Sequence, residues 1–152
     1  MEELFFPEED PKEEKNFQSV TNRKGDFNIL KTDSEFEVVY KKGMFIVSPD
    51  KKLKANYLII PENKKQKIRI GLSVSSKKGN SVWRNRIKRI IKEALRSNDY
   101  LLKDIISQIN AGLWIVFSPH TIDQTNYKKV FLKDIQKSVL DILTQLKIKT
   151  VH

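Results

Sequence analysis

Residues 73–96 constrain the fold and function of this chain more than any other stretch of its sequence. They hold eight Lys and Arg residues and one Glu. When successive residues turn by about 100°, as in a helix, apolar side chains fall on one arc and basic side chains on another. The apolar arc comprises Trp83, Ile87, Ile90, Ile91, Ala94 and Leu95, and the polar arc comprises Asn85, Lys88, Arg89, Lys92 and Arg96. The pattern predicts an amphipathic helix that packs by one face and presents positive charge on the other.

The start of this helix is marked by residues that can cap it. Asn80 or Ser81 can accept hydrogen bonds from the first free backbone amides, so the helix is expected to begin near Val82. Arg84 and Arg86 then lie in the first turn, where the helix dipole disfavours cations. A bound anion would remove this conflict, because free amides and guanidinium groups both donate hydrogen bonds to phosphate. We therefore expect one or more phosphates to bind at this helix terminus.

Two further cations, Lys77 and Lys78, come just before the helix and would add charge to the same site. A charge run is most often a solvated helix face, on which cations alternate with Glu partners. Here nearly all the charge has one sign, which favours a binding surface. The predicted phosphate-contacting residues are Lys77, Lys78, Arg84, Asn85, Arg86, Lys88, Arg89, Lys92 and Arg96.

The same stretch also follows a specific order: Ser73-Val74-Ser75, Gly79-Asn80, Arg84-Asn85-Arg86-Ile87-Lys88-Arg89 and Glu93-Ala94. This order resembles the protein component of bacterial ribonuclease P, and weaker similarity extends from about Leu30 to Leu146. The resemblance implies a protein that binds the catalytic RNA subunit of ribonuclease P and the 5′ leader of precursor tRNA. It would assist endonucleolytic removal of that leader. It also implies that the RNA performs the hydrolysis with magnesium and that the protein alone binds no cofactor. We predict no protein partner.

Charge is distributed unevenly along the 152 residues. The formal net charge is +10, yet residues 1–26 hold eight acidic and four basic residues. The remainder carries 25 basic against 11 acidic residues, which indicates a polyanionic partner. We expect residues 1–26 to form an acidic disordered tail, which by hypothesis folds back over the basic face, and residues 27–152 to form one RNA-binding α/β sandwich domain.

The compartment is predicted from what the sequence lacks. The chain contains no Cys, which excludes disulfides and Cys-ligated zinc. No apolar run reaches the roughly 18 residues that a membrane-spanning helix needs, and no basic-then-apolar signal peptide opens the chain. We expect a soluble, cytoplasmic protein.

The remaining elements follow from caps and periodicity. The capping-box spacing of Thr32 and Glu35 predicts a short helix that stops at Gly43. Strands are predicted at residues 44–47, 55–60, 68–74 and 113–117. Helical spacing recurs at residues 101–109. Thr125 would cap a final helix whose apolar stripe runs from Tyr127 through Phe131 to Leu146. The order α-β-β-β-α-β-α predicts an α+β two-layer sandwich with helices packed on a four-stranded sheet. The family resemblance adds a left-handed crossover between the last two strands, against the usual preference.

Three aromatic residues are candidates for a second site. Phe36 and Tyr40 are four residues apart and share one face of the first helix, and Tyr57 lies on a predicted strand. Spacing alone more often indicates core residues for Phe36 and Tyr40, and a strand Tyr such as Tyr57 is as typical of packing as of a cleft. The family resemblance implies that these rings line a cleft for the single-stranded leader, where bases stack without sequence preference.

Residues for catalysis by the protein itself are not found in the sequence. The two histidines, His120 and His152, have no partner at metal-ligand or acid–base spacing, and no Asp or Glu cluster has the pattern of a two-metal nuclease. We therefore assign no catalytic residue and no metal site to the protein. A structural RNA-binding protein, such as a ribosome-associated subunit, is the main alternative function; a protein-only nuclease or a DNA-binding helix is less consistent with these residues.

Four positions depart from the pattern of the family. Lys is usual where this chain has Ser76, an apolar residue where it has Lys78, an aromatic residue where it has Ile60, and Arg where it has Ser118. Each departure affects one expected contact and leaves the long motif intact.

Overall fold

The computed structural model describes residues 28–30, 32–61, 68–109 and 111–151. The expected acidic tail lies outside these residues. Along the chain, the elements are β1 (Asn28–Ile29), α2 (Asp33–Lys42), β2 (Met44–Val47), β3 (Leu53–Ile60), β4 (Ile68–Leu72), α3 (Ser81–Ser97), α4 (Asp99–Ile109), β5 (Gly112–Pro119) and α5 (Leu132–Val151).

The strands form one mixed sheet in the order β1-β4-β5-β3-β2. β5 pairs in parallel with β4 on one side and antiparallel with β3 on the other, with Ile115 opposite both Ile70 and Tyr57. β2 pairs antiparallel with β3, and the two-residue β1 pairs in parallel with β4. The predicted α+β sandwich is confirmed, and β1 adds a short fifth strand to the four that were expected.

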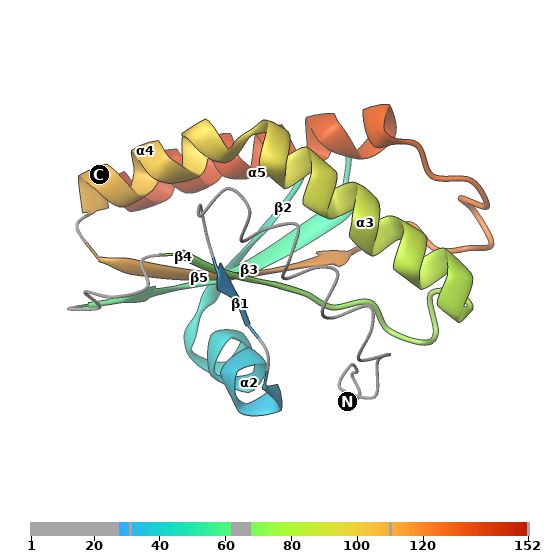
Figure 1. Ribbon diagram of the computed structural model, residues 1–152, viewed down its shortest axis with the longest axis horizontal. Coiled ribbons are helices and arrows are strands. Elements are labelled where there is room, and N and C mark those ends of the chain that lie inside the picture. Colours follow the sequence, from blue (N-terminus) through green and yellow to red (C-terminus); the bar gives the residue numbers. More distant parts are fainter. Residues whose placement is uncertain (1–27, 31, 62–67, 110, 152) are drawn as a thin grey trace.

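The sheet separates two layers of helices, as Figure 1 shows. Of the described helices, α3, α4 and α5 cover one face and α2 lies on the other. Alternation along each strand assigns side chains to these faces. In β5, Leu113, Ile115 and Phe117 join the core beneath α3–α5, whereas Val116 joins a smaller cluster beneath α2 that contains Phe36.

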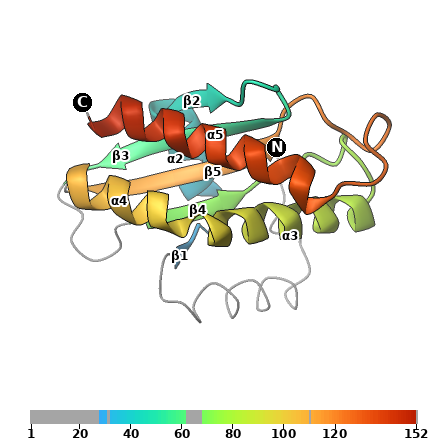
Figure 2. The same ribbon diagram turned by 90° about the horizontal axis from the view of Figure 1, so that it is seen from above.

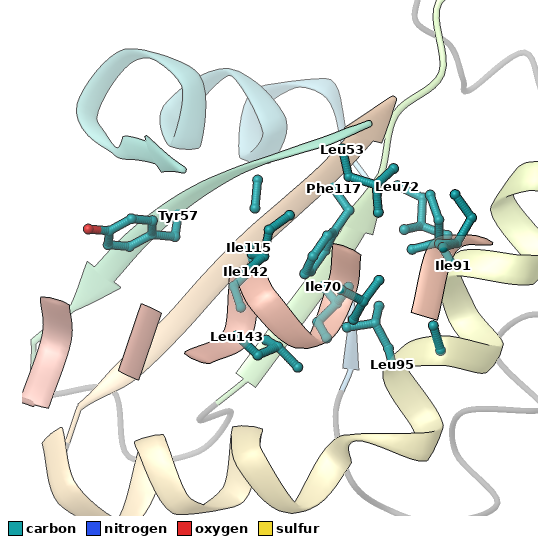
Figure 3. Close-up of a cluster of buried hydrophobic side chains, with 14 of the residues drawn as sticks. Leu53, Tyr57, Ile70, Leu72, Ile91, Leu95, Ile115, Phe117, Ile142 and Leu143 are labelled. Carbon is teal, nitrogen blue, oxygen red and sulfur yellow. The ribbon is translucent and has the colours of Figure 1, made fainter. Parts of the chain in front are cut away.

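The main core lies between the sheet and the three-helix layer (Figure 3). Ile70, Ile115 and Phe117 from the strands, with Ile91 from α3 and Ile142 from α5, are fully buried. Complete burial of one such side chain contributes about 1.5–3 kcal/mol. The apolar arc predicted for residues 83–95 therefore packs as expected and holds α3 against the sheet.

The connection from β4 to β5 runs through α3 and α4. In Figure 2 both strands point to the right, the helices lie in front of the sheet, and β5 lies above β4, which makes this crossover left-handed. Most parallel connections are right-handed. The handedness implied by the family resemblance is therefore found in the structure.

The helical segments after β4 are divided at Asn98. Its backbone and side-chain amides donate to the carbonyl oxygens of Leu95 (3.1 Å) and Ala94 (2.9 Å), while Leu101 N donates to Asn98 O (3.1 Å). These bonds end α3 and allow α4 to begin in a new direction. The helical spacing at residues 101–109 is thus confirmed as a separate helix.

The start of the last helix was predicted wrongly. Thr125 does not cap it, because α5 begins at Leu132. Asp123 and Asn126 exchange backbone-to-side-chain hydrogen bonds of 2.8 and 3.0 Å, which fold residues 123–126 into a turn. Tyr127 and Phe131, placed on the helix stripe from periodicity alone, belong to the segment that precedes α5.

The turn between β2 and β3 is fastened to α5 by one carboxylate. Asp50 accepts hydrogen bonds from Ser48 Oγ (2.6 Å), Lys52 N (3.1 Å) and Ser138 Oγ (2.6 Å) on α5. Partial burial opposes ionisation of Asp50, but these hydrogen bonds and the Lys52 charge outweigh it and lower the pKa. The turn also holds Lys51 at φ 65°, a conformation that non-glycine residues rarely adopt.

We expect Asp50→Ala to lower the free energy of unfolding at pH 7 by about 1–3 kcal/mol, the contribution of hydrogen bonds to a charged group. Because the folded-state pKa is lowered, this contribution is complete above the unfolded-state pKa of about 3.9 and disappears as the pH falls through the folded-state pKa. Urea denaturation of both proteins at neutral and acidic pH measures the difference. Asp141→Ala, which removes a surface pair with Lys137, is the control. A pH-independent loss would contradict the role assigned to Asp50.

Candidate nucleic-acid interface

The N-terminus of α3 is capped as the sequence predicts. Asn80 Oδ1 accepts a hydrogen bond from Trp83 N (2.9 Å), which decides between Asn80 and Ser81 in favour of Asn80. No acidic residue lies in the first turn, and Arg84 and Arg86 follow it closely. The cations therefore stand at the positive end of the helix dipole, the arrangement that a bound anion would stabilise.

A row of hydrogen bonds, the α3 ladder, joins the start of this helix to the segment between β5 and α5. The ladder was not foreseen from sequence, because its two sides are about 40 residues apart. Its members are Lys78 Nζ to His120 O (2.6 Å), Gln124 N to Lys78 O (2.7 Å), Asn80 N to Gln124 Oε1 (2.9 Å), Trp83 Nε1 to Tyr127 O (2.8 Å) and Arg86 Nε to Val130 O (3.0 Å).

Close packing beneath the ladder requires a glycine before the helix. A Cβ atom at Gly79 would lie 2.9 Å from Trp83 Cε3 and 3.0 Å from Gln124 Cβ. Both neighbours are held by ladder hydrogen bonds, so they have little freedom to move aside. Gly79 thus lets the loop and the helix start approach each other closely.

The two arginines use one guanidinium nitrogen each to hold the backbone. Arg84 Nε donates to Gly79 O (3.1 Å), and Arg86 Nε donates to Val130 O (3.0 Å). Within the part of the chain that the structure describes, no hydrogen bond occupies their terminal Nη groups. A guanidinium oriented in this way can donate two parallel hydrogen bonds to one phosphate.

The other predicted phosphate contacts differ in their access to solvent. Lys77, Arg86 and Arg89 are exposed, while Lys78, Arg84, Asn85, Lys92 and Arg96 are half-buried. Lys78 already donates to a carbonyl, and Arg96 lies 3.4 Å from Glu93. Lys88 is only 6% exposed, so the structure does not present it as an open phosphate contact. We call the remaining eight residues the α3 basic surface.

The predicted aromatic residues are divided by the sheet. α2 begins with the expected capping box, in which Glu35 N donates to Thr32 Oγ1 and Thr32 N donates to Glu35 Oε1, both at 3.2 Å. This helix places Phe36 against the sheet, 7% exposed, where a Cβ atom at Gly71 would lie 2.7 Å from the Phe36 ring. Phe36 is therefore a packing residue, as spacing alone allowed.

Tyr57 was assigned wrongly to the same surface. It is 5% exposed and belongs to the core beneath α5, on the opposite face of the sheet from α2 (Figure 3). Its hydroxyl donates to Met44 Sδ (3.9 Å), and burial raises the pKa of Tyr57. A Tyr on a strand can face either side, and only the strand register decides which.

Tyr40 is the one predicted aromatic residue that remains accessible, at 43% exposed. Burial of its phenol group raises the pKa of Tyr40, and a hydrogen bond with Ser73 partly offsets this rise. Ser73 follows β4 and precedes the basic segment, so Tyr40 lies where α2 approaches the path toward α3.

The sequence patterns did not identify two residues that lie on the α2 side of the sheet. Phe45 is 59% exposed, and the Lys54 ammonium lies 4.8 Å from the centre of its ring. Ile46, Leu53 and Ala55 enter the main core, so their alternating neighbours Phe45 and Lys54 point toward the face that carries α2. Period-two alternation predicts that Phe45 and Lys54 face away from the core residues next to them. It does not predict which face of the sheet stays uncovered by helices. Tyr40, Phe45 and Lys54 form what we call the α2-side surface.

Two positions where this chain departs from the family pattern lie on the face of the sheet that carries α2. Ser118 and Ile60 are half-buried, on strands β5 and β3. Next to them, Asn56 Oδ1 and Trp114 Nε1 are buried and have no hydrogen-bond partner within the described residues. We find no physical reason in the structure for the change to Ser118.

Groups that could hold a metal ion were sought among the described residues. No set of three or more His, Cys, Asp or Glu side chains is arranged to do so. Likewise, none of the described helices is long and apolar enough to cross a membrane. The described residues offer hydrogen-bond donors, positive charge and exposed rings, which bind polyanions and bases.

Comparison with known proteins identifies relatives that share nearly the whole described fold. A family model described as Ribonuclease P matches residues 25–146. The ribonuclease P protein component of Clostridioides difficile (strain 630) is 39% identical over 123 residues, which cover 78% of this chain and 93% of the relative. The corresponding protein of Alkaliphilus metalliredigens (strain QYMF) is 34% identical over 121 residues, covering 80% and 95%.

Solved structures give the same picture. The Staphylococcus aureus RNase P protein superposes with a TM-score of 0.58 at 25% identity, over 82% of this chain and 97% of that one. The Thermotoga maritima RNase P protein superposes with a TM-score of 0.60 at 20% identity, over 78% and 96%, and supports the fold.

The cap of α3 can be tested directly. We expect Asn80→Ala to lower the free energy of unfolding by about 0.5–2 kcal/mol, because one first-turn amide loses its acceptor. Ser81→Ala, one position later, should have a much smaller effect. Thermal or chemical denaturation of both variants measures this, and equal losses would show that the cap was assigned to the wrong residue.

Proposed function

The chain belongs to the ribonuclease P protein family, and on this premise we propose that its α3 basic surface binds the catalytic RNA of ribonuclease P while the α2-side surface holds the 5′ leader of precursor tRNA. Its function is that of the protein subunit of an endoribonuclease ribonucleoprotein that produces the mature 5′ end of tRNA. The observation that carries the assignment of surfaces is the pair of arginines at a helix N-terminus, whose Nη groups take no hydrogen bond from the residues that the structure describes.

Binding to RNA follows from the chemistry of the α3 basic surface. Phosphate contacts release condensed counterions and supply most of the sequence-independent affinity. Arg84 and Arg86 are oriented by backbone hydrogen bonds, so less side-chain freedom is lost when phosphate binds. The free amides of the first turn of α3 add donors for the same anion.

The protein contributes position and charge to the reaction, and the RNA contributes the hydrolysis. No group of three or more His, Cys, Asp or Glu side chains among the described residues could hold a metal ion. We assign the catalytic magnesium to the RNA, as the family resemblance implies. Positive charge near the cleavage site reduces the repulsion between two RNA backbones. A held leader raises the affinity for precursor above that for the mature product, which lacks the leader.

Leader binding is assigned to Tyr40 and Phe45, with Lys54 beside them. Exposed rings stack on bases of any sequence, and a neighbouring ammonium attracts the backbone. The Ser73 side chain lowers the pKa of Tyr40, which indicates that this surface lies near the segment that enters α3. A precursor could therefore contact the α2-side surface while the catalytic RNA contacts α3.

The assay that tests the proposal is cleavage of a precursor tRNA by the matching catalytic RNA at low magnesium, with and without this protein. We expect the protein to stimulate cleavage at the mature 5′ end. Tight RNA binding without stimulation would overturn the subunit role and favour a structural RNA-binding protein.

The role of the arginines is tested by salt dependence. We expect Arg84→Ala with Arg86→Ala to weaken binding to the catalytic RNA and to reduce the slope of log K against log salt by about 0.7–0.9 for each lost contact. Arg84→Lys with Arg86→Lys keeps the charge and should retain most of the slope. Filter binding over a range of salt measures both, and a wild-type slope in the alanine variant would exclude these contacts.

Leader stacking is tested by comparing two ligands. We expect Tyr40→Leu with Phe45→Leu to weaken binding of precursor tRNA by about 1–3 kcal/mol per lost stack, with little effect on mature tRNA. Tyr100→Leu, which alters an exposed ring on α4, is the matched control. An equal loss for both ligands would instead indicate a packing role for the two rings.

A further inference from the structure

The segment that leads into α5 and the first turn of α5 carry cations to which the proposed function assigns no role. Lys128, Lys129 and Lys133 are exposed, and Phe131 between them is 49% exposed. We propose that these four residues, the 128–133 surface, form a second contact for the catalytic RNA, in which the lysines bind backbone phosphates and the Phe131 ring stacks on an unpaired base. This inference rests on the proposed function and extends it to a different element of the fold.

The backbone that carries Lys128 and Lys129 is anchored beside α3. Tyr127 O and Val130 O accept ladder hydrogen bonds from Trp83 Nε1 (2.8 Å) and Arg86 Nε (3.0 Å). Lys128 and Lys129 are the two residues between these anchors, so their backbone is held beside the first turns of α3. The segment that carries the 128–133 surface therefore lies beside the start of α3, as the ribbon in Figure 2 also shows.

The three lysines of the 128–133 surface differ from other cations of the fold in their charge partners. No ion pair joins Lys128, Lys129 or Lys133 to a carboxylate in the described part of the chain. Two other lysines of α5 are paired: Lys137 lies 3.1 Å from Asp141, and Lys147 pairs with Asp104. Lysines that have no ion pair among the described residues favour a polyanion, because no carboxylate described there compensates their repulsion.

The two nearby acids are engaged with backbone amides. Asp123 Oδ1 accepts from Asn126 N (3.0 Å), and Asp134 Oδ2 accepts from Phe131 N (3.3 Å). The second bond fixes the backbone of Phe131 just before α5 begins. These carboxylates shape the segment and leave the lysine ammonium groups for an external partner.

The 128–133 surface also presents an exposed aromatic ring. Val130 is fully buried and anchors the segment, whereas Phe131 turns outward. An exposed aromatic ring among cations is the combination that single-stranded nucleic acids use, since bases stack on rings while phosphates meet positive charge. RNA is favoured over an acidic protein because this surface adjoins the α3 basic surface, which is already assigned to the RNA.

The test compares two pairs of substitutions with the same loss of charge. We expect Lys129→Gln with Lys133→Gln to reduce the salt slope for binding to the catalytic RNA, without precursor tRNA, by about 1.4–1.8 for two lost phosphate contacts. Lys41→Gln with Lys149→Gln, at exposed sites on α2 and at the far end of α5, should change the slope much less. Phe131→Leu should lower the affinity by about tenfold and leave the slope unchanged, as for a lost stack.

Each outcome separates the two proposals. If the wild-type protein binds the RNA and stimulates cleavage, but the lysine variant has the same slope as its control, the 128–133 surface is not an RNA contact and the proposed function stands. An acidic protein would then be the better occupant. If the wild-type protein neither binds the RNA nor stimulates cleavage, both proposals fail. Unchanged melting temperatures exclude misfolding of the variants.

Discussion

The whole structure depends on the burial of β5 at the centre of the sheet. This strand pairs with β4 and β3 along its length, and its apolar side chains enter both cores. Leu113, Ile115 and Phe117 pack under the three-helix layer while Val116 packs under α2. Because β5 is parallel to β4, the chain must return across the sheet between them. The helices α3 and α4 make this return, and so the basic helix begins at the end of the sheet where β4 leaves it.

The placement of α3 leaves a local electrostatic conflict that the rest of the fold does not remove. Two arginines stand near the positive end of the helix dipole, with no acidic residue in the first turn. The carbonyl oxygens of Gly79 and Val130 each accept one of their N–H groups, and Asn80 caps the helix. These bonds orient the cations without neutralising them. The fold therefore maintains an electrostatic site that a phosphate ligand would stabilise further.

The two faces of the sheet present surfaces that suit two kinds of RNA ligand. The helical layer gathers fixed cations on α3 and on the segment before α5, which suits a folded RNA with many phosphates. The opposite face carries exposed Tyr40 and Phe45, which suits unpaired bases. Such a division would allow one small protein to hold two RNA chains without competition between them, because neither surface needs residues of the other.

The sequence by itself determined the local elements. Helical periodicity and an Asn cap located α3, the Thr32–Glu35 capping box located α2, and the long basic motif indicated the family. These signals involve residues a few positions apart, so their geometry is set within one element. The start of α5 was missed because a turn at residues 123–126 and the ladder to α3 hold Phe131 outside the helix that its spacing predicted.

Only the tertiary structure decided which face each strand residue meets. Alternation shows that Tyr57 shares a face with Ala55, but it does not say whether α2 or α5 covers that face. Packing between distant segments made this choice, burying Tyr57 and Phe36 and leaving Phe45 and Tyr40 accessible. The ladder from residues 78–86 to 120–130 likewise depends on the β4–β5 pairing. Contacts of this kind depend on the arrangement of the whole chain, and no short stretch of sequence encodes them.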